Sequence, residues 1–371
     1  MNYILVKHFR KKTNYKADLL LQSYNSPIHG HPAWEDIPIK IPQNIIQYDP
    51  KKALEIFNDA ILENNWKMPF WVKENPIHYS IIDKFLTKYF DKFHTTKKQI
   101  NHHISDMKSY DFVLADGFSG ISAMLSKTPF AIRPFGTDID VMPFEKNFRG
   151  KMVRKAFQKC KAVCMYTTIP SLYDLGLEEK FVQISYVIDT VQMSPSEKKS
   201  SNQIDFFLAS RLDFKLKGTD KVLKAFSRLL QKYDAHLFCL EFGSDVKQTK
   251  ELLIQLGIEK NVTIYDFVVS KPVLKELFNK SDAVIADLKR GIIGTTGFEA
   301  MACEKPVIGF SKIENLLEKE MPILNSFSED EIYKNMIRIC EKNDIPKGMR
   351  NFVIENFSFE KFLNKFEKFL E

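Results

Sequence analysis

The second half of the chain alternates short apolar runs with segments that are apolar on one helical face. The apolar runs have the length of β-strands and lie at 204–210, 235–242, 262–267, 283–286 and 306–310. The segments with helical spacing lie between them, at 221–230, 246–256, 271–278 and 295–303. This regular alternation of strand and helix predicts an α/β domain.

The predicted strands of this half are apolar at nearly every position. Strands of this kind are buried on both faces, which is typical of a parallel sheet covered by helices. We therefore predict a doubly wound, Rossmann-like domain over residues 196–354. Ligands on such sheets bind beyond the carboxyl ends of the strands.

The first half of the chain is less regular. Apolar runs at 112–115, 130–133 and 181–188 indicate strands, and a glycine-containing turn follows each of the first two. Residues 7–75 are rich in Pro, Asn and aromatic residues, and their pattern predicts irregular structure. We interpret residues 1–195 as a second α/β domain.

Two further segments complete the predicted organisation. Residues 190–203 are polar, with Ser, Lys and one Pro, and indicate a linker between the two domains. Residues 359–370 place aromatic side chains at three- and four-residue spacing, which predicts an amphipathic helix. We expect the C-terminal segment 355–371 to dock back on the N-terminal domain.

Composition narrows the class of protein. A length of 371 residues suits two domains, and 44% hydrophobic with 27% charged residues is globular composition. The sequence has no run of about 18 apolar residues, so we expect no membrane-spanning helix, and its N-terminal apolar stretch is too short for a signal peptide. Five cysteines, an odd number, favour reduced thiols over a disulfide framework, and we expect a cytoplasmic protein.

The net charge of +7 is unevenly distributed. Residues 1–200 hold 28 Lys and Arg against 21 Asp and Glu, whereas residues 201–371 hold 26 of each. Part of the excess clusters between Arg149 and Lys161. A positive half suits an anionic partner such as a membrane surface, a phosphorylated substrate or nucleic acid, and it also suits a solvated helix face. No recognised motif supports nucleic-acid binding, so we expect none.

Cations follow the first strand of the C-terminal half. The string SRLDFKLKG contains Arg211, Lys215 and Lys217, and it leads through Gly218 into a predicted helix. Cations beside a helix N-terminus can hold an anion, and Arg offers phosphate a bidentate fork. Solvated surface charge is the simpler interpretation of this feature alone. After the second strand, Gly243 marks a tight turn where backbone can approach a ligand.

The string GIIGTTGFE opens a later helix. Gly291 and Gly294 lie three residues apart, and Thr295 and Thr296 add hydroxyl groups. This pattern predicts a phosphate cradle at a helix N-terminus, with Glu299 one turn further on and able to accept hydrogen bonds from sugar hydroxyls. The glycine spacing differs from the dinucleotide fingerprint and from the P-loop. Residues 266–268 could line a pocket for a flat group, or belong to the core.

Taken together, these motifs resemble the C-terminal domain of the retaining glycosyltransferases of family 4, which have the GT-B fold. The similarity covers residues 204–310, and FEAMACEKPVI at 298–308 is close to the most recognisable string of that family. The resemblance implies two Rossmann-like domains that face each other across a cleft. It also implies that Arg211 and Lys217 hold the donor diphosphate and that Glu299 binds the ribose.

The same resemblance assigns further residues and shows three departures. It implies that Gly294 and Thr295 offer amides to the diphosphate, and that residues near Phe267 and Val268 face the base. Gly291 stands where the family usually has a Glu, which leaves the donor sugar open. Only one glycine, Gly243, matches the usual pair after the second strand. In the loop PFGTD, Phe135 stands at the position of a usual His, and Asp138 matches the Asp of the Gly-Ser-Asp form.

We therefore expect sugar transfer from a nucleotide-diphosphate sugar with retention of configuration and without a required cofactor. The candidate catalytic residues are Arg211, Lys217, Glu299 and Asp138. The candidate donor-binding residues are Gly243, Phe267, Val268, Gly294, Thr295, Thr296 and Glu299. The pattern Asp138-Ile-Asp140 resembles a metal-binding Asp-x-Asp motif, but it lies in the half away from the donor residues, so we expect no metal site.

The acceptor and the alternatives stay open at this point. A lipid-linked sugar at an anionic membrane would use the positive charge and the aromatic residues of the first half, and a soluble glycan is nearly as good an interpretation. Cell-envelope polysaccharide biosynthesis would suit either. Alternatives are a catalytically silent nucleotide-sugar binder or partner subunit, since Gly291 replaces a Glu, and a GT-B nucleotide-sugar epimerase. A phosphorylase would need a cofactor lysine context that the sequence lacks.

Overall fold

A computed structural model describes residues 2–22, 31–75, 104–117, 119–166, 168–184, 186–197, 203–289, 291, 293–312 and 320–370. The chain divides into two compact units. Unit 1 contains residues 1–17, 25–70 and 187–359, and unit 2 contains residues 18–24, 71–186 and 360–371. This division differs from the predicted boundary at 195, because two N-terminal segments group with the C-terminal half. Part of the predicted linker, residues 198–202, lies outside the described residues.

Unit 1 is built on a six-stranded sheet. Its strands are β8 (Ile204–Leu208), β9 (Ala235–Leu240), β10 (Val262–Tyr265), β12 (Ala283–Ile285), β13 (Val307–Gly309) and β14 (Leu324–Asn325). Every pairing is parallel, and the spatial order is β10-β9-β8-β12-β13-β14. In chain order this is 3-2-1-4-5-6, the order of the Rossmann fold, with a switch point between β8 and β12. The predicted doubly wound α/β sheet is therefore confirmed.

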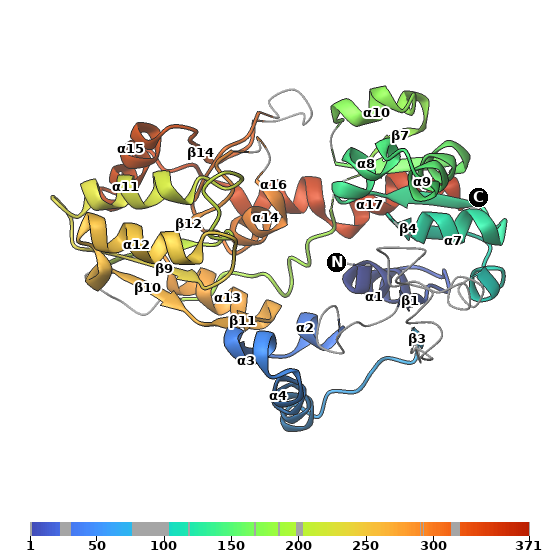
Figure 1. Cartoon of the computed structure of the whole chain (residues 1–371), viewed down its shortest axis with the longest axis horizontal. Coiled ribbons are helices and arrows are strands. Elements are labelled where there is room, and N and C mark those ends of the chain that lie inside the picture. The colour runs from blue at the N-terminus through green and yellow to red at the C-terminus, as the bar shows by residue number, and fades with distance from the viewer. Residues whose placement is uncertain are drawn as a thin grey trace. The chain divides into compact units, whose positions relative to one another are not determined.

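Helices cover both faces of this sheet, as neighbouring residues of β8 demonstrate (Figure 1). Phe206 makes an edge contact with Phe226 of α11 (Thr219–Leu229), with ring centroids 6.3 Å apart. Phe207 points to the opposite face and contacts Phe278 of α13 (Lys271–Lys280) at 5.8 Å. Successive side chains of a strand alternate between faces, so a continuously apolar strand needs a helix on each side.

Two more helices of unit 1, α12 (Val246–Leu256) and α14 (Gly294–Ala302), begin and end close to the predicted positions. Two others, α15 (Glu329–Cys340) and α16 (Met349–Phe357), were not predicted. α12 ends at Gly257, whose φ of 66° is the left-handed conformation that favours glycine at a helix C-terminus. The single strand predicted at 262–267 is wrong: it divides at Asp266, and β11 (Phe267–Val269) joins another sheet.

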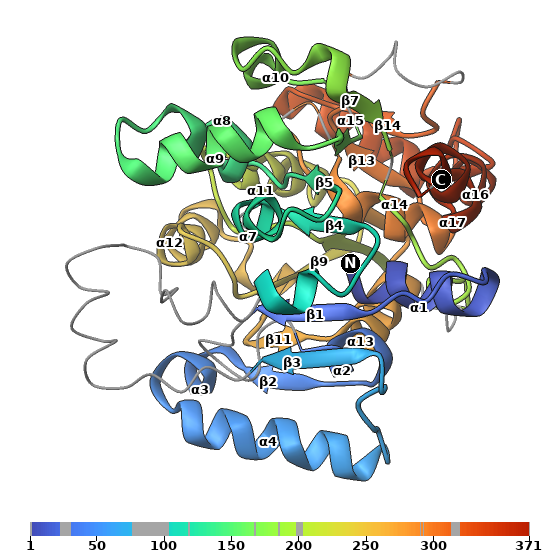
Figure 2. The same ribbon diagram turned by 90° about the vertical axis from the view of Figure 1, so that its right-hand side faces the viewer.

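An ordered segment of unit 1 lies where the sequence predicted irregular structure. It contains α2 (Ala33–Asp36), β2 (Lys40–Pro42), α3 (Gln43–Tyr48) and α4 (Pro50–Glu63). β2 pairs antiparallel with β11, beside it in Figure 2. α4 begins at Pro50 after Asp49, whose carboxylate accepts a hydrogen bond from the amide of Lys52. Ile39, Ile41, Ala53 and Phe57 form a small core of this segment. α1 (Asn2–Lys12) is a further helix of unit 1.

Unit 2 has a smaller parallel sheet of four strands. They are β4 (Val113–Asp116), β5 (Phe130–Arg133), β6 (Ala162–Met165) and β7 (Phe181–Gln183), in that order. A parallel pair, β1 (Leu19–Gln22) and β3 (Val72–Asn75), forms a second sheet. The helices of unit 2 include α7 (Ser119–Ser126), α8 (Thr137–Asp140), α9 (Phe148–Lys159) and α10 (Pro170–Asp174), which Figure 2 shows with β4, β5 and β7.

The predicted C-terminal helix is present as α17 (Phe359–Phe366), followed by a short 3-10 turn. Residues 360–371 belong to unit 2, where Phe366 makes an edge contact with Phe112 at 5.6 Å. Two expectations for the first half need correction. The strand predicted at 181–188 ends at Gln183, and no strand was predicted at the position of β6.

Candidate functional site

A pocket of about 280 Å³, called here the switch-point pocket, lies at the switch point of unit 1. It lies beyond the carboxyl ends of β8, β9 and β12, next to the start of α14, where the topology predicts a ligand site. Its lining residues are Leu208, Ala209, Ser210, Arg211, Lys217, Leu240, Phe242, Ala286, Asp287, Ile293, Gly294 and Thr296. The structure thus brings together four predicted site residues that lie up to 85 positions apart.

Arg211 and Lys217 enter this pocket from the loop between β8 and α11. Asp213 shapes the loop: its carboxylate accepts from the amide of Leu216 at 2.6 Å, and its own amide donates to the Thr219 hydroxyl at 3.1 Å. The Arg211 side chain is exposed, and it makes no hydrogen bond or ion pair with the residues that the structure describes. Its guanidinium is therefore available for an anion.

Lys217 has a carboxylate partner that sequence reasoning missed. Its ammonium pairs with Asp287, which directly follows the β12 region and is 6% exposed. Asp287 also accepts a hydrogen bond from the amide of Lys289 at 3.1 Å. The available signal was an acidic residue at the end of an apolar strand, at the same sheet edge as Lys217. The pair fixes the lysine at the pocket wall.

The start of α14 forms the remaining wall of the switch-point pocket. Gly294, with φ of 55°, is the first residue of this helix, and it lines the pocket together with Thr296. The first amides of a helix have no acceptor within the helix, and they carry its positive dipole end. A diphosphate fits this combination of Arg211, Lys217 and helix N-terminus.

Gly243 is absent from the lining of the switch-point pocket, although it directly follows Phe242, which lines it. It has φ of 150°, and a Cβ there would lie 2.2 Å from the Leu212 carbonyl oxygen. Two backbone hydrogen bonds join these loops: the Leu212 amide donates to Phe242 at 2.8 Å, and the Asp245 amide donates to Leu212 at 3.0 Å. Glycine is required here for the close approach of two backbone segments.

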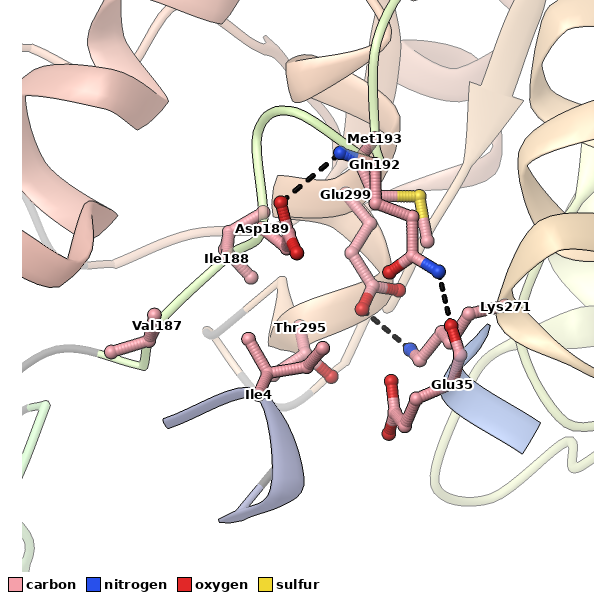
Figure 3. Close-up of a pocket in the computed structure, with 10 residues that line it drawn as sticks. All are labelled: Ile4, Glu35, Val187, Ile188, Asp189, Gln192, Met193, Lys271, Thr295 and Glu299. Carbon is pink, nitrogen blue, oxygen red and sulfur yellow. Dashed lines mark hydrogen bonds and ion pairs between the residues drawn. The ribbon is translucent and has the colours of Figure 1, made fainter. Parts of the chain in front are cut away.

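Glu299 and Thr295 line a second, smaller pocket of about 50 Å³, called here the Lys271–Glu299 pocket (Figure 3). Its other lining residues are Ile4, Glu35, Val187, Ile188, Asp189, Gln192, Met193 and Lys271. Lys271 Nζ lies 2.5 Å from Glu299 Oε1. Burial lowers the pKa of Lys271, but the carboxylates of Glu299 and Glu35 offset this and leave that pKa above its usual value. Sequence reasoning missed Lys271 and Glu35.

Phe267 and Val268 lie in β11, and neither is among the lining residues of the two pockets. Val268 pairs with Ile41 of β2, and the Phe267 ring stacks on Tyr265 at 5.2 Å. The ammonium of Lys40 lies 5.8 Å from the centre of the Phe267 ring. The pairing with β2 therefore occupies one hydrogen-bonding edge of β11, the strand whose residues were expected to face the nucleotide base.

Asp138 lies in unit 2, on α8, and closes its own loop. Its carboxylate accepts from the amides of Phe135 at 2.9 Å and Gly136 at 2.7 Å, and it is 6% exposed. Burial raises the pKa of Asp138, and the two backbone hydrogen bonds oppose this rise. Asp140 instead accepts from the Ser171 hydroxyl at 2.7 Å. Among the described residues, no group of three His, Cys, Asp or Glu side chains could hold a metal ion.

Two further sequence expectations concern cysteines and membranes. All five cysteines are free thiols, and burial raises the pKa of Cys239 and Cys303 to about 12, so neither is a reactive thiolate at neutral pH. In the described part of the chain, every helix is too short or too polar to cross a membrane.

Comparisons with solved structures define the fold class as GT-B. The structure of HepE from Anabaena in complex with UDP and glucose matches with a TM-score of 0.60 and 14% identity, over 85% of this chain and 88% of that one. Sucrose-phosphate synthase from Thermosynechococcus elongatus matches with a TM-score of 0.58 and 12% identity, over 82% and 84%. Identities this low establish the fold alone.

Sequence comparisons point to the same class. Residues 190–319 match the family model described as glycosyl transferases group 1, and they form a domain of that kind. The uncharacterized glycosyltransferase MJ1069 of Methanocaldococcus jannaschii is 27% identical over 192 residues, which are 47% of this chain and 47% of that protein. The chain thus aligns with less than half the length of this curated relative.

Proposed function

We propose that this chain is a glycosyltransferase that transfers a sugar from a nucleotide-diphosphate donor with retention of anomeric configuration, as in family 4. The observation that carries the proposal is the switch-point pocket, where Arg211, Lys217 and the N-terminus of α14 converge. The group 1 domain over 190–319 and the GT-B fold support it. A uridine diphosphate donor is the first choice, since the fold relative HepE was solved with UDP and glucose.

The chemistry follows from charge. When the bond between the sugar and the diphosphate breaks, negative charge grows on the departing phosphate oxygens. Arg211, Lys217 and the amides at Gly294 can stabilise that charge in a fixed arrangement, which is worth several kcal/mol in a site that excludes water. Front-face attack by the acceptor gives retention and needs no protein nucleophile.

The decisive experiment measures sugar transfer by Arg211→Ala and Lys217→Ala. We expect each to lower kcat by roughly 100-fold or more, because each removes a charge from the transition state. Lys215→Ala is the matched control, since Lys215 is exposed on the same loop and absent from the pocket lining. Full activity in both Arg211 and Lys217 variants would refute the assignment.

The products of the same assay distinguish the glycosyltransferase from the alternative functions, an epimerase and a silent nucleotide-sugar binder. An epimerase would convert the nucleotide sugar with no acceptor present, and product analysis would detect the new sugar. A silent binder would hold nucleotide without turnover. A thermal-shift panel of UDP, GDP, ADP, TDP and CMP with their common sugars names the base, because only the cognate nucleotide should raise the unfolding temperature.

We propose a lipid-linked acceptor at an anionic membrane, with a soluble glycan as the alternative, in a cytoplasmic protein of cell-envelope polysaccharide biosynthesis. The exposed Phe144 precedes α9, and the exposed Phe148, Lys151 and Lys155 lie on this helix. Aromatic side chains beside lysines favour an anionic bilayer surface. Vesicles of phosphatidylglycerol should carry the protein upward in a flotation gradient at low salt, and Lys151→Glu with Lys155→Glu should abolish this. Absence of binding at low salt favours the soluble glycan.

A further inference from the structure

The Lys271–Glu299 pocket concentrates charge in a small volume. Figure 3 shows the ammonium of Lys271 directed at the Glu299 carboxylate, with the Glu35 side chain close by. Glu299 is 7% exposed. A volume of about 50 Å³ admits one or two water molecules or the hydroxyl edge of a sugar, and is far too small for a nucleotide. The pocket therefore suits a polar part of a larger ligand.

Lys271 satisfies only one of the two oxygens of Glu299. Its ammonium lies 2.5 Å from Oε1, whereas Oε2 is buried and accepts no hydrogen bond from any residue that the structure describes. A buried acceptor without a donor costs free energy, so such atoms usually mark a place where a ligand or water donates. A hydroxyl group is the donor that fits a carboxylate already neutralised by a lysine.

The position of Lys271 depends on the β2–β11 pairing. Lys271 is the first residue of α13, directly after Ser270, whose amide donates to the Ile39 carbonyl at 3.0 Å. The Ser270 hydroxyl in return accepts from the Ile39 amide at 2.8 Å. The same N-terminal segment carries Glu35, whose backbone carbonyl accepts from the Gln192 side chain (Figure 3). These contacts hold Lys271 between two carboxylates.

The two pockets differ in the charge of the side chains that line them. Thr296 lines the switch-point pocket and Thr295 lines the Lys271–Glu299 pocket, so the first turn of α14 borders both. The carboxylates of Glu35 and Glu299 repel phosphate, which Arg211 and Lys217 attract. A nucleoside diphosphate bound here would place its phosphates in the switch-point pocket and its neutral hydroxyls toward Glu299.

We propose that Lys271 is a positioning residue that holds Glu299 with Oε2 directed at the ribose hydroxyls of the donor. This inference rests on the proposed function. Without the ammonium, Glu299 loses its partner and faces the charge of Glu35 alone, so its carboxylate would turn away from the ribose. Lys271 then sets the preference of the site for a ribonucleotide over a nucleotide that lacks sugar hydroxyls.

The test compares binding of UDP and 2′,3′-dideoxy-UDP by calorimetry, with GDP and ADP pairs run in parallel. We expect the wild type to prefer the hydroxylated nucleotide by about 10- to 100-fold, the range of a hydrogen bond to a charged group. Lys271→Met and Glu299→Gln should each reduce that preference to about threefold or less. Dideoxynucleotide binding should change little, and Lys271→Arg should restore most of the preference.

Two controls make the outcome decisive. Lys250→Met removes the more exposed Lys250–Glu241 pair, at 2.7 Å, whose two residues line neither pocket, and should leave the preference intact. The double variant Lys271→Met with Glu299→Gln should lose no more preference than either single variant, because the two residues act as one unit.

Each failure has its own meaning. If Lys271→Met keeps the wild-type preference, or weakens both nucleotides equally, the positioning role is overturned while the proposed function stands. If the wild type binds none of UDP, GDP and ADP, the proposed function itself fails, and this inference fails with it.

Discussion

At the scale of single residues, ion pairs explain how cations that line the two pockets are held in place. Lys217 is paired with Asp287, and Lys271 with Glu299, so both lysines that line the two pockets have a carboxylate beside them. Arg211 differs, because its exposed side chain makes no such pair with the described residues. A paired cation is held in one place at a low cost in desolvation, whereas Arg211 is open to an incoming anion.

At this scale we predict that Asp287→Asn destabilises the free protein and strengthens its response to nucleotide. The Lys217 and Asp287 side chains are 16% and 7% exposed, so loss of the carboxylate leaves a partly buried charge and should lower the free energy of unfolding by about 1–3 kcal/mol. UDP would resupply negative charge, so its thermal shift should exceed that of the wild type. Glu241→Gln, which breaks a more exposed pair, is the control.

Most of what the sequence could predict concerns the positions of the secondary-structure elements. The strands and helices from β8 to β13 follow the apolar runs because both faces of the sheet need covering, and this requirement is visible in the chain itself. Residues 31–66 were not predictable in this way. Their short elements are stabilised by the pairing of β2 with β11 and by a core around Phe57. The pairing depends on residues more than 200 positions away, and the core depends on close packing.

At the element scale we predict that segment 31–66 loosens in mild acid. Burial lowers the pKa of His31 to about 4, and its Nδ1 accepts a hydrogen bond from the Ala33 amide at 3.1 Å. The stability from neutral His31 is therefore complete above pH 6.5 and falls as the pH drops from 6.5 toward 4, by up to about 3 kcal/mol.

Fluorescence of Trp34 and Trp66, which lie in this segment, should report the change between pH 7 and pH 4. His31→Phe keeps an aromatic ring against Phe57 but cannot titrate, so its fluorescence should stay flat over the same range. An unchanged acid transition in that variant would contradict the assignment to His31.

The whole molecule consists of two units, and neither is a continuous stretch of chain. Unit 2 is completed by residues 360–371, where Phe362 and Phe366 are buried. Unit 1 is completed by residues 1–17 and 25–70. Linear boundaries inferred from composition could not reveal this exchange of segments, because it is decided by which apolar faces bury each other.

At this scale we predict that Phe366→Ala destabilises unit 2 selectively. Phe366 is 3% exposed, and its truncation should cost about 3 kcal/mol. Hydrogen exchange should accelerate in peptides of β4 and β5, while β8 and β12 keep their protection. Phe226→Ala, at 0% exposure in the core of unit 1, should give the reverse pattern. Equal loss of protection in both units would show that they unfold as one.

The sequence by itself determined the doubly wound sheet of unit 1 and the meeting of Arg211, Lys217, Gly294 and Thr296. Parallel strands bring their carboxyl ends to one edge, so residues that follow strands converge there whatever their separation in the chain. Only the tertiary structure decided that Asp287 pairs with Lys217, that Lys271 pairs with Glu299, and that residues 31–70 join unit 1. The reason is that these contacts arise between side chains of packed elements, and strand and helix periodicity carries no information about such partners.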